Sequence, residues 1–353
     1  MKILHCADIH LGSKMEARLP KEKSDERKVE LRASFNRMIE RAKAEGVRLV
    51  LLSGDVFDSE RPLKRDKEFF YSVVGNNPEI DFLYLRGNHD GKESYVEYGL
   101  ANLKTFGGEW TKYSYGELDV YGIEMDAGNA QSLYSTLKTD AGRKNIVMLH
   151  GQAGDGSGKD KVNLTKLRNR AIDYLALGHI HAYECQKLDD RGIWAYSGCL
   201  EGRGFDEPGE KGFVLLDTDG EWKAEFVPNA TRVIEEIQVD VTGTADFYGA
   251  FQKCRQSIKC KKTDLLRINL VGEIDYDNAT LAVDMRKNFE NDYYFVSVKD
   301  KTVRRFDMEK IAADPSLRGE FIRTVLARTD LDEQFKQKVV DAGLKALSGR
   351  EVD

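Results

Sequence analysis

The sequence predicts an α/β fold over residues 1–230, followed by a small α+β domain at 231–300 and a helical tail at 301–353. In the first part, short apolar runs alternate with segments whose apolar residues recur every three or four positions, as in alternating strands and helices. Five of the apolar runs end directly before a short polar motif, and α/β sheets collect their binding chemistry at such strand ends. With 353 residues, 41% of them hydrophobic, the chain can build more than one core.

The first part contains elements whose positions follow from periodicity and from turn residues. The first helix is expected where Leu31, Phe35 and Ile39 share one face, and Gly46 is a plausible stop after it. Asp217-Thr218-Asp219-Gly220 separates two apolar runs and predicts a strand hairpin. The expected strands and helices lie, in chain order, at 2–7, 28–45, 49–52, 66–74, 82–85, 93–106, 146–149, 174–177, 213–216 and 222–227.

The pattern restarts after Pro228, so 229–232 is the expected boundary. Strands at 233–241, 265–271 and 293–298 alternate with helices at 244–259 and 278–291, in the order of a small α+β domain. After Pro315, apolar stripes beginning at Leu317 and Leu331 predict two helices. These helices either pack on the body of the protein or form a docking element for another protein.

Composition narrows the class of protein. Five cysteines without a CxxC pair fit reduced thiols and give little support to a cysteine zinc site. No stretch approaches the roughly 18 apolar residues of a membrane span, and the N-terminus enters a strand at once, so we expect a cytoplasmic protein without a membrane partner. The net charge of −6 argues mildly against a coat of nucleic acid, although the distribution of charge decides binding.

The polar motifs at the five strand ends carry the chemistry. They are Asp8-Ile9-His10, Gly54-Asp55, Gly87-Asn88-His89-Asp90, His150 and Gly178-His179-Ile180-His181. A lone histidine motif is weak evidence, because a single histidine is more often structural. Five motifs at strand ends together predict one metal site, and more specifically a site for two metal ions.

The residue types indicate which ions and which reaction. Carboxylate, imidazole and amide groups together suit manganese, iron or zinc and exclude a soft thiolate site. An aspartate can share its two oxygens between ions about 3.5–4 Å apart, and such a pair activates water and holds a phosphate. A histidine near the ions but not bound to them can give a proton to the leaving oxygen.

These motifs resemble those of the calcineurin-like metallophosphoesterase superfamily, whose pattern is D-x-H, GD, GNH[DE], H and GHxH. Within it, the tracts 7–12, 54–58 and 197–201 are similar to the DNA-repair exonuclease branch of Mre11 and SbcD nuclease subunits. The resemblance implies a two-sheet αββα sandwich, with the small domain in the place of a DNA-capping domain. Archaeal and eukaryotic relatives often have a histidine where this chain has Asp58, which agrees better with the bacterial branch and leaves open how the substrate phosphate is held.

The resemblance also assigns roles to individual residues. One ion would be held by Asp8, His10 and His181, the other by Asn88, His150 and His179, and Asp55 would bridge them. His89 would act on the leaving group, with Asp90 holding its ring; the alternative is that His89 is a structural histidine beside the site. The expected cofactors are two divalent ions, Mn²⁺ first, with Fe²⁺ or Zn²⁺ as alternatives.

Three functions are compatible with this site. The leading hypothesis is a manganese-dependent nuclease that cuts DNA phosphodiester bonds. The second is a phosphoesterase for a small molecule or a phosphoprotein, because metal ions recognise phosphate and water rather than the leaving group. The third is a non-catalytic DNA-binding or scaffolding subunit, which the complete motif set disfavours.

Partners follow from the resemblance. Relatives dock a Rad50- or SbcC-like coiled-coil ATPase, for which the C-terminal helices are the candidate element. Relatives also form homodimers, expected here through the helices at 66–74 and 93–106. DNA contacts would be mainly to phosphates. The candidate basic residues in the small domain are Lys253, Lys261, Lys262 and Arg267.

Overall fold

The computed structural model describes residues 1–15, 19–95, 99–156, 158–220, 222–276, 279–304 and 312–347. The chain divides into two compact units, Met1–Ile234 and Glu235–Asp353. The three-part division expected from the sequence stays a prediction, and residues 305–311 and 348–353 of the expected tail lie outside the described residues.

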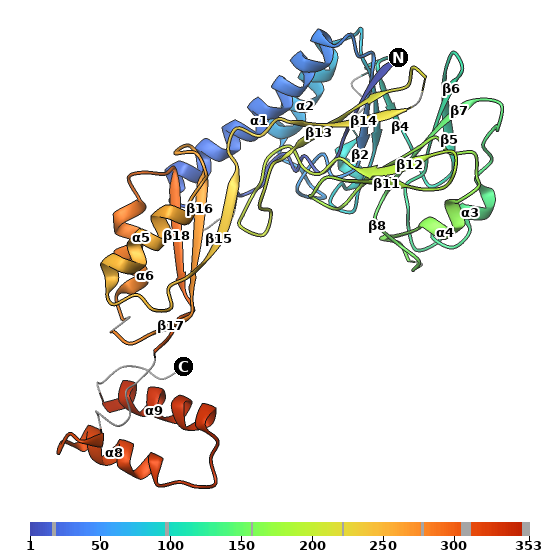
Figure 1. The fold of residues 1–353 in the computed structure, drawn as a ribbon. Helices are drawn as coiled ribbons and strands as arrows, with labels where there is room; N and C mark the ends of the chain where they lie inside the picture. Colours follow the sequence, from blue (N-terminus) through green and yellow to red (C-terminus); the bar gives the residue numbers. More distant parts are fainter. Residues whose placement is uncertain are drawn as a thin grey trace. The chain divides into compact units, whose positions relative to one another are not determined.

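The first unit contains a six-stranded sheet in the order β14-β13-β1-β2-β3-β4 (Figure 1). Its strands are β1 (Lys2–Cys6), β2 (Leu49–Ser53), β3 (Asp81–Leu85), β4 (Leu103–Thr105), β13 (Gly212–Asp217) and β14 (Lys223–Pro228). Strands β1 to β4 run parallel, and β13 pairs antiparallel with both β1 and β14. The hairpin predicted around Asp217–Gly220 is therefore confirmed as β13 and β14.

A second six-stranded sheet has the order β11-β12-β10-β7-β6-β5. Its strands are β5 (Thr111–Tyr115), β6 (Leu118–Gly122), β7 (Lys144–His150), β10 (Tyr174–Gly178), β11 (Glu184–Lys187) and β12 (Ile193–Tyr196). Its four inner strands, β6, β7, β10 and β12, run parallel. A separate pair consists of β8 (Gln152–Gly154) and β9 (Lys161–Asn163).

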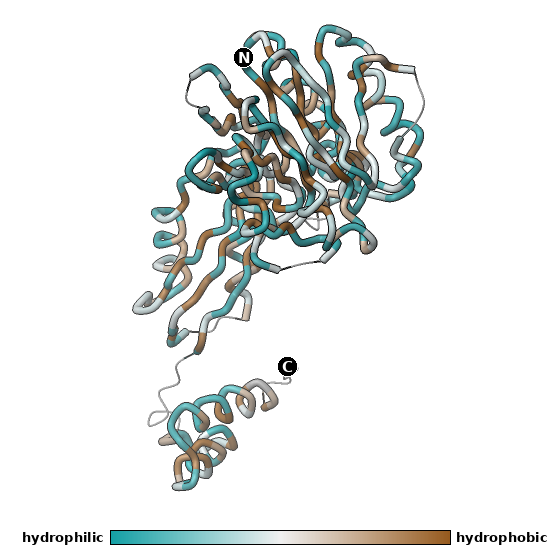
Figure 2. The backbone as a smooth tube through the Cα atoms, turned by 90° about the vertical axis from the view of Figure 1, so that its right-hand side faces the viewer, coloured by the Kyte–Doolittle hydropathy of each residue, from teal (hydrophilic) through white to brown (hydrophobic). Residues whose placement is uncertain are grey.

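Helices cover the outer faces of both sheets, which makes four layers (Figure 1). Helices α1 (Lys21–Ala44) and α2 (Lys64–Gly75) belong to the first sheet, and α3 (Leu133–Thr136) and α4 (Leu164–Leu167) to the second. Alternate residues of one strand enter different cores: in β2, Val50 and Leu52 pack with the α1 and α2 layer, whereas Leu49 and Leu51 pack between the sheets. Figure 2 shows the resulting concentration of apolar residues along the central strands. The predicted αββα sandwich is confirmed.

The helix predicted at 93–106 is wrong. The described part of this segment holds one 3₁₀ turn, Lys92–Ser94, and the short strand β4, while residues 96–98 lie outside the described residues. Gly99 has φ +64°, a left-handed conformation that interrupts a helix, and Leu103 pairs with Phe82 of β3. The apolar spacing was misleading because Tyr95, Leu100 and Leu103 pack on the same core from a loop and an edge strand.

The second unit contains a three-stranded sheet in the order β15-β16-β18. Its elements are β15 (Ile234–Asp240), α5 (Phe247–Ser257), β16 (Leu265–Val271), α6 (Leu281–Phe289) and β18 (Phe295–Asp300), with a small pair formed by β17 (Glu273–Ile274) and β19 (Val303–Arg304). The predicted alternation of strands and helices is present. Helices α8 (Leu317–Leu326) and α9 (Glu333–Leu347) follow the predicted apolar stripes and share a core of Ile322, Val325, Val340 and Leu344. Within the described ranges, we find no helix that is both long and apolar enough to cross a bilayer.

Candidate metal centre

The seven predicted metal-binding side chains come from the ends of five strands of the first unit. Asp8 follows β1 and Asp55 follows β2, and the two loops are joined by hydrogen bonds from Asp8 N to Gly54 O and from His10 N to Asp55 O, both of 3.0 Å. His150 is the last residue of β7, and its neighbour strand β10 ends at Gly178, directly before His179. Parallel strands in both sheets therefore deliver their carboxyl ends to one place.

The backbone at this place is unusual. Asp8, His10 and Asp55 have φ values of 52°, 52° and 53°, and His179 has 103°, in the left-handed region that residues with a side chain rarely adopt. Each such residue costs on the order of 1–3 kcal/mol and persists where the surrounding fold enforces it. Close packing adds a second constraint, because a Cβ on Gly87 would lie 2.2 Å from Asp55 Oδ1. Strain of this kind is typical of functional sites.

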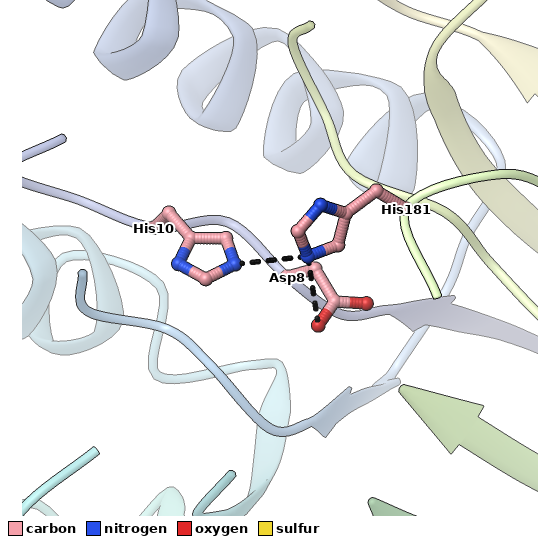
Figure 3. A group of neighbouring side chains, drawn as sticks. All are labelled: Asp8, His10 and His181. Carbon is pink, nitrogen blue, oxygen red and sulfur yellow. Dashed lines mark hydrogen bonds and ion pairs between the residues drawn. The ribbon is translucent and has the colours of Figure 1, made fainter. Parts of the chain in front are cut away.

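The first predicted ligand group converges as expected. Figure 3 shows the side chains of Asp8, His10 and His181 turned toward one another. His10 Nε2 lies 3.2 Å from His181 Nε2, and His181 Nε2 lies 4.0 Å from Asp8 Oδ1. Two imidazole nitrogens that face each other share at most one proton, so this arrangement suits a common cation.

The second group also converges. Asn88 Oδ1 lies 3.0 Å from His150 Nε2 and 3.2 Å from His179 Nδ1. On the far side of its ring, His150 Nδ1 lies 2.9 Å from Ser53 O, which fixes the orientation of the imidazole. Asn88 is exposed and His150 is buried, so solvent can approach the site from the side of Asn88.

Asp55 lies between the two groups. Its Oδ2 is 3.9 Å from His10 Nε2 and 3.3 Å from His150 Nε2. Burial alone would raise the pKa of Asp55, but the hydrogen bond and charge of His150 outweigh burial and hold this pKa well below its usual range. Burial would likewise lower the pKa of His150, yet Asp55 raises it to about 9. A bound cation would replace the proton on His150, because histidine ligates metals in its neutral form.

The distances fit metal ions. Ligand atoms about 2.1 Å from one ion lie roughly 3.0 Å apart at right angles and roughly 3.4 Å apart at the tetrahedral angle. The contacts within each group, from 3.0 to 4.0 Å, are close to these separations. Oxygen and nitrogen donors without a thiolate favour manganese, iron or zinc. The residues present therefore fit a pair of divalent ions, and their role as ligands is a proposal.

The predicted pairing of His89 with Asp90 stays a prediction, and the contacts of Asp90 in the structure are of another kind. Both carboxylate oxygens of Asp90 accept backbone N–H groups, from Phe57 at 2.9 Å and from Gly87 and Val56 at 3.1 and 3.2 Å. No hydrogen bond joins Asp90 to the ring of His89 among the residues that the structure describes. Asp58 is an acid beside the ring of His89: one carboxylate oxygen of Asp58 and one ring nitrogen each of His10 and His89 lie within 4.8 Å of one another.

The sequence reasoning missed two residues beside the site, Arg203 and Glu207. Glu207 Oε1 lies 2.7 Å from His181 Nδ1, and Arg203 forms ion pairs with Glu207 and Asp58. Both residues follow the tract 197–201 that carries part of the family resemblance. In the sequence, only the glycines and charged residues at 202–207 could have indicated these two positions, and they match none of the metal motifs.

The four predicted DNA-binding residues of the second unit differ in exposure and in their contacts within the chain. Lys261 and Lys262 are exposed. Lys253 Nζ donates to the carbonyls of Asp240 and Thr242 at 3.2 and 2.7 Å. Arg267 is half-buried and forms an ion pair of 3.6 Å with Glu236. Lys261 and Lys262 are therefore the stronger candidates of the four.

The fold and the site define a class of protein: a four-layer αββα phosphoester hydrolase whose paired ligand groups suit two metal ions. The family described as calcineurin-like phosphoesterase matches residues 1–183 of this chain. The chain therefore belongs to the calcineurin-like phosphoesterase family, whose members use a dinuclear metal centre.

Relatives of known sequence extend this match. The metallophosphoesterase YhaO of Bacillus subtilis is 28% identical over 275 residues, covering 71% of this chain and 66% of YhaO. The DNA double-strand break repair protein Mre11 of Sulfurisphaera tokodaii is 26% identical, covering 68% of this chain and 63% of the relative. The protein of that name from Sulfolobus acidocaldarius is 24% identical, covering 78% and 76%. The chain thus spans just under two thirds of the length of the first two relatives.

Solved structures show a weaker likeness. The protein TT1561 of Thermus thermophilus has a TM-score of 0.44 and 14% identity, covering 64% of this chain and 98% of that chain. A dimetal phosphatase from Danio rerio has a TM-score of 0.40 and 10% identity, covering 61% and 92%.

Proposed function

We propose that this protein is a two-metal DNA nuclease that hydrolyses phosphodiester bonds with Mn²⁺ and works as the nuclease subunit of a complex with a Rad50- or SbcC-like ATPase. The observation that carries the proposal is the extent of similarity to DNA double-strand break repair proteins. The first unit holds 234 of 353 residues, so a match covering 78% of the chain includes part of the second unit. A shared phosphoesterase domain alone does not account for that extent.

Different side chains of the site would have different roles in hydrolysis. When bound, the two divalent ions would lower the pKa of water and neutralise charge at phosphorus. Asp55 contacts His10 of one group and His150 of the other and would bridge the ions, and the exposed Asn88 would be the ligand on the solvent side. His89 is exposed, its backbone N–H donates to Asp55 Oδ1 at 2.8 Å, and its ring lies 5.0 Å from the His10 ring, in an edge-on arrangement. It is therefore held at the site and can donate the proton that the leaving oxygen needs.

Two cavities flank the ligand groups. The larger, of about 630 Å³, is lined by Asn88 and His150 and by side chains of both charges, the cations Arg61, Lys92 and Lys159 among a larger number of acids. The smaller, of about 500 Å³, is lined by Lys14, Asp58 and Arg203. Cations beside the first cavity suit phosphates on either side of a scissile bond. They also suit a smaller phosphoester, so the cavity by itself does not decide between the two functions.

Cleavage of DNA tests the proposal. The purified chain, loaded with Mn²⁺ to two ions, is incubated with end-labelled single- and double-stranded DNA and, separately, with bis-nitrophenyl phosphate. We expect DNA cleavage that EDTA abolishes and that His89→Ala reduces. Turnover of the small ester with no cleavage of either DNA at full metal loading would favour the alternative, a phosphoesterase for a small molecule or phosphoprotein. Equal DNA cleavage by wild type and His89→Ala would contradict the proposed site.

The C-terminal helices are the proposed docking element for the ATPase. Leu317 is 70% exposed, Phe335 51% and Leu347 42%, so apolar anchors remain uncovered on α8 and α9. Removing residues 317–353 should spare manganese-dependent cleavage and abolish association with the ATPase subunit in a pull-down of the two purified proteins. Association that survives the deletion would refute this assignment.

A homodimer stays part of the proposal, now through α2 alone, because the second expected helix is not formed. Phe69 and Val73 of α2 are only partly buried within this chain. Sedimentation velocity at micromolar concentration measures the oligomeric state directly. A monomer at all concentrations would remove the dimer from the proposal without affecting the nuclease site.

A further inference from the structure

Arg203 joins two carboxylates that stand behind two of the proposed metal ligands. Its Nη1 donates to Asp58 Oδ1 at 2.8 Å, and its Nε and Nη2 donate to Glu207 Oε1 at 3.0 and 2.7 Å. Glu207 Oε1 lies 2.7 Å from His181 Nδ1, and Asp58 Oδ1 lies at an ion-pair distance of 3.1 Å from His10 Nδ1. The ring nitrogens that face away from the ligand cluster, one on each histidine, thus each lie beside a carboxylate that the same guanidinium holds.

All three nitrogens of the Arg203 guanidinium are used in contacts within the protein. Its side chain is 19% exposed, and each of its three nitrogens contacts a carboxylate. Nη2 also lies 3.1 Å from His181 Nδ1. The planar guanidinium has donors in fixed directions and so holds the two carboxylates in fixed positions, which the rotating ammonium group of a lysine cannot do. A free arginine would suit the binding of a substrate phosphate, whereas the donors of this one already point at carboxylates of the chain.

The loop that carries Arg203 and Glu207 is itself anchored. Lys211 Nζ donates to the carbonyl of His181 at 2.8 Å. At the other end of the loop, the buried Glu201 forms an ion pair of 2.9 Å with the buried Arg27 of α1. These contacts hold the loop in place. We therefore expect a displacement of Arg203 to move the histidine rings rather than the loop.

We infer that Arg203, with Asp58 and Glu207, is a positioning group that sets the orientation of His10 and His181 and thereby the affinity of one of the two metal sites. The inference rests on the metal centre of the proposed function but not on the identity of the substrate. Outer hydrogen bonds of ligating histidines are worth about 10- to 100-fold in metal affinity. The effect should be confined to the ion held by Asp8, His10 and His181.

Charge and positioning make opposite predictions for the same residue. If Arg203 acted only through its charge, Arg203→Lys would leave Mn²⁺ affinity unchanged and Arg203→Met would tighten it, because a repelling cation is removed. If Arg203 positions the histidines, both variants should weaken one site by about 10- to 100-fold. Arg168, whose side chain is exposed and lies outside this network, offers a matched control in Arg168→Met.

Isothermal titration of the metal-free full chain with MnCl₂ measures both sites. We expect two sites in wild type and Arg168→Met, and one weakened site in Arg203→Lys. The effect of Arg203→Lys should disappear in a His181→Ala background, which identifies the site that Arg203 serves. An unchanged affinity in Arg203→Lys, or a tighter one in Arg203→Met, would overturn the inference.

A second variant and the separate measurement of DNA cleavage complete the test of Arg203. If Arg203→Lys fails to fold by circular dichroism, Glu207→Gln takes its place, and a folded Glu207→Gln with wild-type affinity at both sites would equally overturn the inference. Wild-type protein that binds two ions yet cuts no DNA would refute the proposed nuclease while leaving the role of Arg203 measurable.

Discussion

The carboxylate of Asp90 accepts the backbone N–H of Phe57 at 2.9 Å and so joins the turn after β3 to the turn after β2. The N–H groups of Val56 and Gly87 point at the same carboxylate. Burial raises the pKa of Asp90 to about 7, and the backbone N–H groups of Phe57 and Gly87 oppose this shift because they favour the ionised acid. Asp90 therefore fixes the relative position of the loops that carry Asp55 and Asn88, both proposed metal ligands.

Asp90→Asn should destabilise the first unit by about 1–3 kcal/mol, because one acceptor oxygen becomes an amide that cannot accept the facing N–H groups. The three tryptophans, Trp110, Trp194 and Trp222, all lie in this unit, so fluorescence-detected urea unfolding in EDTA reports on it alone. Asparagine keeps the side-chain volume, so packing is preserved. Unaltered unfolding together with a reduced kcat would instead indicate that Asp90 acts through His89.

His89→Ala should lower the rate of phosphodiester cleavage by about 10²- to 10⁴-fold, the usual contribution of a general acid. Metal binding should remain, because the contact from His89 to Asp55 Oδ1 is made by its backbone N–H, which alanine retains. Asn88→Ala is the matched comparison, since it removes a proposed ligand and should lower both cleavage and Mn²⁺ stoichiometry. Loss of a bound ion in His89→Ala would mean that this histidine is a ligand rather than an acid.

The arrangement of the site could be predicted from the sequence because two regularities combine. Apolar runs such as 49–52 identify buried strands, and parallel strands bring the residues after them to one edge. Asp8 and Asp55 meet for this reason, since β1 and β2 are parallel neighbours in the sheet. The histidines of the second sheet join them because both sheets turn their strand ends to the same place.

The other features of the site and fold could not be predicted, because they depend on contacts between residues that lie far apart in the sequence. Arg203 and Asp58 are separated by 145 positions in the chain, and neither belongs to a repeating pattern. Leu103 has the spacing of a helical residue, but pairing with Phe82 of β3 makes it part of a strand. Tertiary pairing overrode local preference there, as it often does in short apolar segments.

Gly87→Ala should disrupt the site, because its Cβ would lie 2.2 Å from Asp55 Oδ1. The clash forces either the carboxylate or the GNHD loop to move, which typically costs about 1–3 kcal/mol. We expect lower thermal stability and weaker Mn²⁺ binding. Gly107→Ala is the control, since a Cβ there meets nothing within 4 Å. Wild-type melting temperature and metal affinity in Gly87→Ala would contradict the packing described for this loop.

The double variant Lys261→Gln/Lys262→Gln should weaken DNA binding without changing cleavage of bis-nitrophenyl phosphate. Each phosphate contact contributes about 0.9 to the slope of log affinity against log salt for duplex DNA, so losing two should flatten the slope by about 1.8. Fluorescence anisotropy between 50 and 200 mM salt, roughly the range over which such contacts weaken, measures this. Lys138→Gln, at a lysine of the first unit, serves as the comparison. An unchanged slope would exclude both lysines from the interface.

His5 makes the stability of the first unit depend on pH. It is fully buried in β1, where its Nδ1 lies 2.9 Å from Tyr174 Oη, and burial lowers the pKa of its imidazole to about 3. The unfolded chain binds a proton at His5 below about pH 6.5, whereas the folded chain does not until about pH 3. Because the folded-state pKa is lowered, this contribution to stability is complete above pH 6.5 and is lost progressively as the pH falls toward 3.

His5→Gln should therefore reduce the acid sensitivity of the first unit. One proton is worth about 1.4 kcal/mol per pH unit, so between pH 7.5 and pH 5 wild type should lose about 2 kcal/mol more than the variant. Glutamine retains a polar group opposite Tyr174, and EDTA in both samples removes any effect of bound metal. Tryptophan-detected urea unfolding at the two pH values gives the difference directly, because the other titrating groups are common to both proteins. Parallel losses in the two proteins would show that His5 takes up its proton over the same pH range in the folded and the unfolded chain.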